Sequence, residues 1–228
     1  MKNIFIFSGV GVISVNDNYN LLQNNTTNWG FFENFLQVNT LSELQIYCIK
    51  TFAVQISLYE LWENWGVTPD IILGFSLGEV AACCISGLIN LFDAVEIILN
   101  IAKEVEKENG WLCHGYDLNL VENTFNSSLN FKEENKIHST VCGLNESFEN
   151  FQKNNPDCKK MHVKNPWHHE VYNKNIIIEI PNQNKCKTEL YLTSTTNLTT
   201  KLEEDHWVKW LFTKSNMINT ITNLQQTQ

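Results

Sequence analysis

The stretch DIILGFSLGEVAACCISG, residues 70–87, places one serine, Ser76, between two glycines, after an apolar run and before a run of small residues. The run DIILGF is too apolar for a strand with a solvated face, and it predicts a parallel strand covered by helices on both sides. A helix is expected to open at Gly78–Glu79 and to end near Gly87. The stretch therefore predicts an α/β fold with Ser76 in the turn between a strand and a helix.

The pentapeptide Gly74-Phe75-Ser76-Leu77-Gly78, between a strand and a helix, has the pattern of a nucleophile elbow. The two glycines have no Cβ, so the strand and the helix can approach closely while the serine Oγ is presented outward. The backbone N–H of Leu77, at the start of the helix, is placed to stabilise an oxyanion. The pentapeptide alone also fits a structural turn, and the flanking strand and helix favour a catalytic serine.

The other expected elements come from the periodicity of apolar residues. Before the elbow, a buried strand over 3–9 leads to a polar, Asn-rich connection over 16–28, and 41–65 predicts one long helix or a kinked pair. After the elbow, a helix over 93–105 is expected to have Asp93 as its N-cap. The strands and helices expected beyond it lie at 111–118, 130–134, 136–143, 146–154 (a helix), 159–164, 188–196 and 203–212 (a Trp-rich helix).

Short strands and a helix in this order predict a small α+β insert within the α/β fold. We therefore expect an α/β-hydrolase-like large subdomain with a parallel sheet, residues 1–110 and 188–228, and a ferredoxin-like small subdomain, residues 111–187. Trp207 and Trp210 of the Trp-rich helix are expected in a core.

Composition excludes several classes of protein. The net charge is −9 and the pI about 5.1, and every one of the 16 Lys+Arg residues is a lysine, so a nucleic-acid partner is disfavoured. No apolar stretch is long enough for a membrane helix, and no motif indicates a bound metal. The seven cysteines form no CxxC pair and fit reduced thiols in a cytoplasmic protein.

A serine is a poor nucleophile unless a base takes its proton, which makes a histidine the expected partner. Of six histidines, His168 and His169 lie in VKNPWHHEVYN, a loop-like stretch after an expected strand, where catalytic groups often lie.

Five blocks of the chain resemble, in order, the acyltransferase domains of polyketide and fatty-acid synthases and the related malonyl-CoA:acyl carrier protein transacylases. The blocks are FIFSGVG, VQISLYELWENWGVTPDIILGFSLGEVAACCISGLINLFDAVEII, STVCGLNESFENF, CKKMHVKNPWHHEVY and ELYLTSTTN with HWVKWLF. In that family the chain usually continues past the Trp-rich helix into a final strand and a GP-like loop, whereas this sequence ends at TITNLQQTQ.

The resemblance implies a Ser-His dyad, in which Ser76 attacks a thioester and His168 relays protons. The turn SGVG matches the family's PGQG loop, so the N–H of Val10 would be the second oxyanion donor beside that of Leu77. No bound cofactor is implied, because acyl-CoA or a phosphopantetheinyl carrier protein is the substrate. The pocket positions that the family implies are Phe75, Ile101, Trp167 and His169.

Ile101 stands where malonyl-type members carry the arginine that holds the substrate carboxylate. No arginine occurs elsewhere, and Lys103 lies about 200° around the helix from position 101. A buried carboxylate without a partner costs several kcal/mol, which favours an uncharged acyl group.

Two other functions stay open. Relatives that lack the arginine act as acyl hydrolases, which release stalled acyl groups to water from carrier proteins. The chain could also be a non-catalytic docking module for an acyl carrier protein. Carrier proteins are acidic, so a lysine cluster is a candidate docking surface. Its members are Lys153, Lys159, Lys160, Lys164 and Lys174.

Overall fold

The computed structural model describes residues 2–11, 19–172 and 176–226. Its contacts group the chain into two compact units. The first unit comprises Met1–Ala102, Pro181–Leu192 and Leu198–Leu202, and the second comprises Lys103–Ile180, Thr193–Asn197 and Glu203–Gln228. This grouping places residues 203–226 in the second unit, and the subdomain bounds 1–110 with 188–228 and 111–187 stay a prediction.

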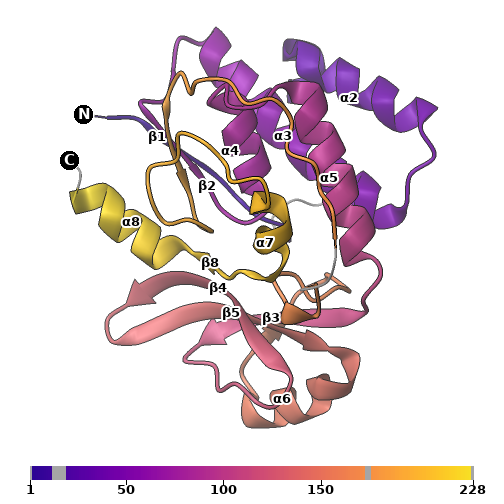
Figure 1. Ribbon diagram of the computed structural model, residues 1–228, viewed down its shortest axis with the longest axis vertical. Helices are drawn as coiled ribbons and strands as arrows, with labels where there is room; N and C mark the ends of the chain where they lie inside the picture. The colour runs from indigo at the N-terminus through magenta and orange to yellow at the C-terminus, as the bar shows by residue number, and fades with distance from the viewer. Residues whose placement is uncertain (1, 12–18, 173–175, 227–228) are drawn as a thin grey trace. The chain divides into compact units, whose positions relative to one another are not determined.

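The first unit carries a parallel sheet and most of the long helices (Figure 1). Its elements are β1 (Ile4–Phe7), α1 (Asn20–Asn25), α2 (Thr27–Val38), α3 (Glu43–Asn64), β2 (Ile71–Gly74), α4 (Gly78–Ile85), α5 (Leu91–Val105, whose last turn belongs to the second unit) and β7 (Glu189–Leu192).

The second unit carries a mixed sheet. Its elements are β3 (Gly110–Tyr116), β4 (Thr124–Glu133), β5 (Lys136–Leu144), η1 (Asn145–Ser147), α6 (Phe148–Asn154), β6 (Lys159–Lys160), η2 (Glu170–Tyr172), α7 (His206–Phe212), β8 (Ser215–Asn216) and α8 (Met217–Gln226).

The three strands of the first sheet are parallel, in the order β1-β2-β7. Every residue of β2 is buried, as expected for a central parallel strand with both faces covered. Phe7 pairs with Gly74, and Gly74 with Leu192, so the three strands end side by side. The predicted α/β fold with a parallel sheet is confirmed, and the elbow lies at the carboxyl edge of its central strand.

Two glycines allow α4 to lie directly against this edge. A Cβ at Gly74 would stand 2.5 Å from Glu79 Cα, and a Cβ at Gly78 would stand 2.1 Å from the carbonyl oxygen of Phe7. Neither contact is sterically possible, so the sequence GFSLG is required by packing as well as by any chemistry.

The long helix predicted at 41–65 is one helix, α3, without division into a pair. Ser42 and Gln45 form a capping box at its start, in which each side chain accepts from the other residue's backbone N–H. The Asn-rich connection expected at 16–28 contains α1 in its described part, and α2 was not predicted. Helix α2 packs on α3, where the rings of Phe32 and Phe52 lie edge to face with their centroids 5.5 Å apart.

One predicted cap is wrong. Helix α5 begins at Leu91, and Asn90 Oδ1 accepts the backbone N–H of Asp93 at 2.9 Å. Asn90 therefore caps the helix, while Asp93 lies in its first turn, where a negative charge is favourable.

The second sheet has the order β6-β3-β5-β4-β8. Pairs among its first four strands are antiparallel, and β8 runs parallel to β4. The order of the first four is that of a ferredoxin-like sheet. The antiparallel pairing of these four strands also agrees with that expectation, whereas the first crossover, residues 117–123, contains no helix. One core cluster joins the sheet to α6 through Trp111, Cys113, Val141 and Phe151.

Two further elements follow the Trp-rich helix α7. Strand β8 pairs with β4, and α8 packs against β4. Asn216 caps α8, because its Oδ1 accepts the N–H of Asn219 at 3.1 Å. Trp207 and Trp210 are buried, as predicted.

Among the residues described, no helix combines the length and the apolar character that crossing a bilayer requires.

The glycine packing at the elbow gives a stability prediction. Gly78→Ala is expected to lower the free energy of unfolding by at least about 2 kcal/mol, because the new methyl group meets backbone atoms of β1. Forced overpacking of a core costs about 1–3 kcal/mol, and backbone atoms cannot move aside as a flexible side chain can. Gly30→Ala is the control: it lies inside α2 with open space around its Cβ, and it should raise stability by about 0.5–1 kcal/mol. Urea denaturation of both variants measures this difference, and equal effects would contradict the packing analysis.

Candidate active site

Ser76 occupies the turn between β2 and α4 with a backbone φ of +53°, a conformation that costs energy for any residue with a Cβ. The Phe75 N–H donates to the Phe7 carbonyl at 2.9 Å, and the Glu79 N–H donates to the Ser76 carbonyl at 2.8 Å. Backbone bonds on both sides therefore hold the serine in its strained conformation, as in a nucleophile elbow.

The loop after β1 lies against this serine. A Cβ at Gly9 would stand 2.8 Å from Ser76 Cβ and 3.2 Å from its Oγ, so only glycine lets the loop pass so close. Gln55 Nε2 donates to the Ser8 carbonyl at 2.6 Å, and the Gly11 N–H donates to the Tyr47 hydroxyl at 2.6 Å. Two side chains of α3 thus fix the loop that carries Val10.

The predicted oxyanion donors lie on the two segments that meet at Ser76. Leu77 is the N-cap of α4, where backbone N–H groups have no partner within the helix, and Val10 follows Gly9 in the loop. Both side chains are buried, and Phe75 is half-buried. The first unit thus brings together Ser76, Leu77, Val10 and Phe75, while the roles of the last three remain predictions.

His168 lies in the second unit, almost completely buried, with a backbone φ of +58°. Its Nδ1 lies 2.8 Å from the Trp210 carbonyl oxygen, in the last turn of α7. Its ring also contacts the Trp210 ring, with centroids 4.4 Å apart. One residue of α7 therefore fixes the imidazole through both its ring and its carbonyl group.

The carbonyl oxygen can only accept a hydrogen bond, so Nδ1 carries the proton in the neutral ring and Nε2 carries the lone pair. Burial lowers the pKa of His168 to about 4, against a smaller opposing effect of the carbonyls of Trp210 and Thr213. The ring is neutral at pH 7, with Nε2 as its basic atom.

Ser215 and Trp210 are site residues that sequence reasoning missed. Ser215 Oγ lies 3.5 Å from His168 Nε2 and is fully buried in β8. No sequence signal could identify Trp210, because its backbone carbonyl makes the hydrogen bond. Gly9 could have been found, since it is the first glycine of the turn after β1.

The other predicted pocket residues are also placed. Ile101 is fully buried in α5, and Lys103 on the same helix is exposed. His169 Nδ1 accepts a hydrogen bond from the Val171 N–H at 3.0 Å. The centroid of its ring lies 4.5 Å from that of the Phe125 ring in β4. Trp167 packs edge to face on Trp210. Their contact with an acyl group remains a prediction, as does the pairing of Ser76 in one unit with His168 in the other.

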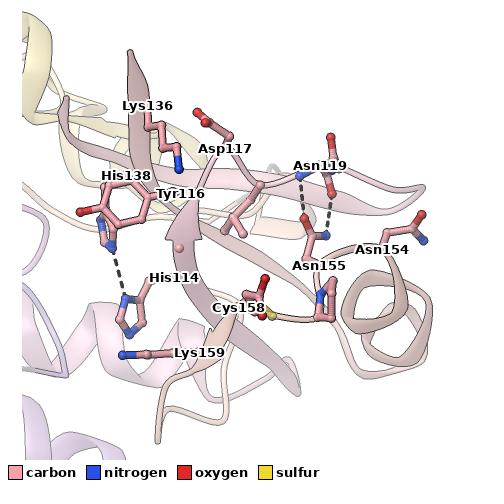
Figure 2. Close-up of a pocket in the computed structure, with 14 residues that line it drawn as sticks. His114, Tyr116, Asp117, Asn119, Lys136, His138, Asn154, Asn155, Cys158 and Lys159 are labelled. Carbon is pink, nitrogen blue, oxygen red and sulfur yellow. Dashed lines mark hydrogen bonds between the residues drawn. The ribbon is translucent and has the colours of Figure 1, made fainter. Parts of the chain in front are cut away.

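A separate hollow of about 460 Å³ lies in the second unit beside β3 and β5 (Figure 2). In its wall, His114 Nδ1 lies 3.3 Å from His138 Nε2. Burial and Lys159 lower the pKa of His114, while burial and His114 lower that of His138. Within the described residues, no group of three His, Cys, Asp or Glu side chains is arranged to hold a metal ion.

Three members of the lysine cluster line hollows of the second unit. Lys159 lines the hollow of Figure 2, whereas Lys160 and Lys164 line one of about 500 Å³. Lys160 Nζ lies 3.9 Å from the centre of the Phe148 ring. Lys174 lies outside the described residues, and docking at these lysines stays a prediction.

Residues 7–111 match the sequence family described as "Acyl transferase domain". The chain is 51% identical over 59 residues to "Probable polyketide synthase 23" of Dictyostelium discoideum, which is 26% of this chain and 2% of that protein. It is 44% identical over 54 residues to "Polyketide synthase GfsA" of Streptomyces halstedii, 24% of this chain and 1% of that protein. The chain thus spans a very small part of the length of these relatives.

Solved structures with the same fold cover nearly the whole chain. The acyltransferase domain from the second module of the salinomycin polyketide synthase has a TM-score of 0.81 at 16% identity, over 99% of this chain and 61% of that one. The malonyl-CoA:ACP transacylase of Synechocystis sp. PCC 6803 has a TM-score of 0.76 at 15% identity, over 100% of this chain and 87% of that one.

These comparisons agree with the strand, elbow and helix described above. By sequence, residues 7–111 match the acyl transferase domain family, and by fold nearly the whole chain resembles solved acyltransferase and transacylase structures.

Proposed function

We propose that this domain transfers an acyl group from a CoA or carrier-protein thioester, through an ester on Ser76, to the thiol of an acyl carrier protein in polyketide or fatty-acid synthesis. The observation that carries the proposal is the elbow: a serine at φ +53° between a parallel strand and a helix, with the Gly9 loop against its hydroxyl. The family match over residues 7–111 includes this elbow.

The chemistry needs a base, and His168 suits that role. With Nδ1–H held by the Trp210 carbonyl, Nε2 can take the proton of Ser76 as Oγ attacks the thioester carbonyl. The backbone N–H groups of Leu77 and Val10 would stabilise the oxyanion. Nε2 then returns the proton to the leaving thiolate, and a second thiol reverses both steps.

The buried Ile101 supports an acyl group without a free carboxylate. Its side chain is fully buried, the chain contains no arginine, and Lys103 is exposed. A carboxylate beside Ile101 would meet neither the family's arginine nor Lys103, and an unpaired buried carboxylate costs several kcal/mol. Acetyl or longer fatty acyl groups are therefore the proposed substrates.

The seven cysteines of the chain, all within the described residues, form no disulfide bond, which fits a reducing compartment such as the cytoplasm.

Ser76→Ala is expected to abolish formation of an acyl adduct, because the nucleophilic oxygen is lost. The measurement is intact mass after incubation with hexanoyl-CoA or hexanoyl carrier protein. Ser8→Ala is the matched control, since it removes a neighbouring hydroxyl and leaves the Ser8 carbonyl that Gln55 holds. An adduct that passes to fresh carrier protein indicates a transferase, and free acid indicates a hydrolase. The proposal would be contradicted if an adduct still formed on Ser76→Ala, or if no adduct formed on the wild-type protein with any donor. The second result would favour a docking module.

Malonyl-CoA should acylate the protein at least about 100-fold more slowly than acetyl-CoA, the ratio that corresponds to about 3 kcal/mol of unpaired-charge penalty. Initial rates of adduct formation with the two donors measure it. Equal rates would contradict the role assigned to Ile101.

The rate of acylation should stay near its neutral value down to about pH 5 and fall with a midpoint near pH 4, where His168 Nε2 gains a proton. Folded His168 and His206 stay neutral to about pH 4, while unfolded histidine is protonated below about 6.5, so stability falls as the pH drops across this window. A rapid pH jump from pH 7 therefore measures the rate before the protein unfolds. A midpoint near 6.5 would be inconsistent with a buried His168 as the base.

A further inference from the structure

A second hydroxyl group lies beside the imidazole of His168, within the second unit itself. Ser215 Oγ is 3.5 Å from His168 Nε2, and its residue is fully buried. This Nε2 is the atom that the proposed function uses as the base. Ser215 lies 47 residues from His168 in the sequence, so only folding brings the two together.

The position of Ser215 is fixed on both sides. Its strand β8 pairs in parallel with β4, where Ser215 is opposite Ser128. The next residue, Asn216, donates its N–H to the Thr193 carbonyl at 2.9 Å and caps α8 with its side chain. The hydroxyl is therefore carried by a short backbone segment with little freedom to move.

The imidazole is held from its other edge. Trp210 binds Nδ1 through its carbonyl at 2.8 Å and packs its ring against His168. With that edge fixed, the Nε2 edge is the one that faces Ser215. A hydroxyl–nitrogen bond is usually about 2.8–3.0 Å long, so a rotation of the Ser215 side chain that brings Oγ about 0.5 Å closer, with the backbone fixed, would complete this one. Contacts of catalytic groups commonly shorten in this way when substrate binds.

We propose that Ser215 is a positioning residue for His168, whose hydroxyl holds the Nε2 edge of the ring and accepts a hydrogen bond from Nε2–H while that atom carries the proton of Ser76. The proposal rests on the proposed function. The geometry carries it: a buried hydroxyl, fixed by a strand ladder and a helix cap, lies beside the basic nitrogen.

The roles of the hydroxyl follow from its chemistry, because it can both donate and accept a hydrogen bond. After the proton has moved from Ser76 Oγ to Nε2, the ring is a cation and Ser215 Oγ can accept from Nε2–H. The proton itself then goes from Nε2 to the leaving thiolate sulfur, and Ser215 keeps its own proton throughout.

Two nearly isosteric variants isolate the hydroxyl. Ser215→Thr keeps it, and Ser215→Val replaces it with a methyl group of similar size, so any packing cost is shared between them. Ser215→Ala is the smaller alternative if both larger side chains lower the melting temperature. Ser128→Ala is the control in the same ladder, since its hydroxyl donates to Asn130 and not to His168.

Two measurements follow on each variant: the ¹⁵N chemical shift of His168 Nε2, and the rate of Ser76 acylation as a function of pH. We expect Ser215→Val to change the Nε2 shift and to lower the acylation rate about tenfold, the effect of one lost hydrogen bond to a charged group. Its acid midpoint should also move to lower pH, because the charged ring loses an acceptor. Ser215→Thr and Ser128→Ala should stay within about threefold of the wild-type rate.

An unchanged ¹⁵N shift in Ser215→Val would overturn the contact. Equal rates and midpoints in the Thr and Val variants would overturn the positioning role, because the effect would then come from packing. Wild-type protein that forms no adduct would contradict the proposed function instead, and the ¹⁵N shift would still decide the contact.

Discussion

The contact between the start of α4 and the end of β1 is the constraint on which the first unit depends. The Gly78 Cα lies so close to the Phe7 carbonyl that a methyl group would overlap it. This approach places the helix N-terminus at the carboxyl edge of the parallel sheet, and the short connection from β2 must then turn sharply. The positive φ of Ser76 is the result, held in place by the hydrogen bonds from the Phe75 N–H to the Phe7 carbonyl and from the Glu79 N–H to the Ser76 carbonyl.

A second close approach adds to the first. A Cβ added at Gly9 would stand 2.8 Å from Ser76 Cβ, and two α3 side chains, Gln55 and Tyr47, hold the loop there. The hydroxyl of Ser76 and the backbone of the loop are therefore positioned by the same sheet edge. Such rigidity is what an oxyanion site requires, because its donors should need no reorganisation when charge develops.

The sequence predicted the elements whose signal is local and strong. The apolar run of β2, the glycines around Ser76 and the periodicity of α3 each determine a structure within a few residues. The sequence failed where tertiary packing overrides local preference. Helix α2 contains Asn and Gly, and β4 begins with TFNSSL, so neither looks regular in isolation, yet α2 is covered by α3 and β4 is paired with β5. In the candidate site, Ser76 and His168 could be named from motifs, whereas Ser215 and the carbonyl of Trp210 could not, because their positions follow from the packing of β8 and α7.

The hydrogen bond from His168 to Trp210 has a consequence for the evolution of the domain. The orienting partner of the imidazole is a main-chain oxygen, which every amino acid at position 210 would supply. Substitutions there can remove the indole ring, but they cannot delete the acceptor unless the end of α7 shifts. Replacement of this buried indole would cost packing energy without abolishing the tautomer of the histidine, and a scan of side-chain replacements would overlook the group that sets it.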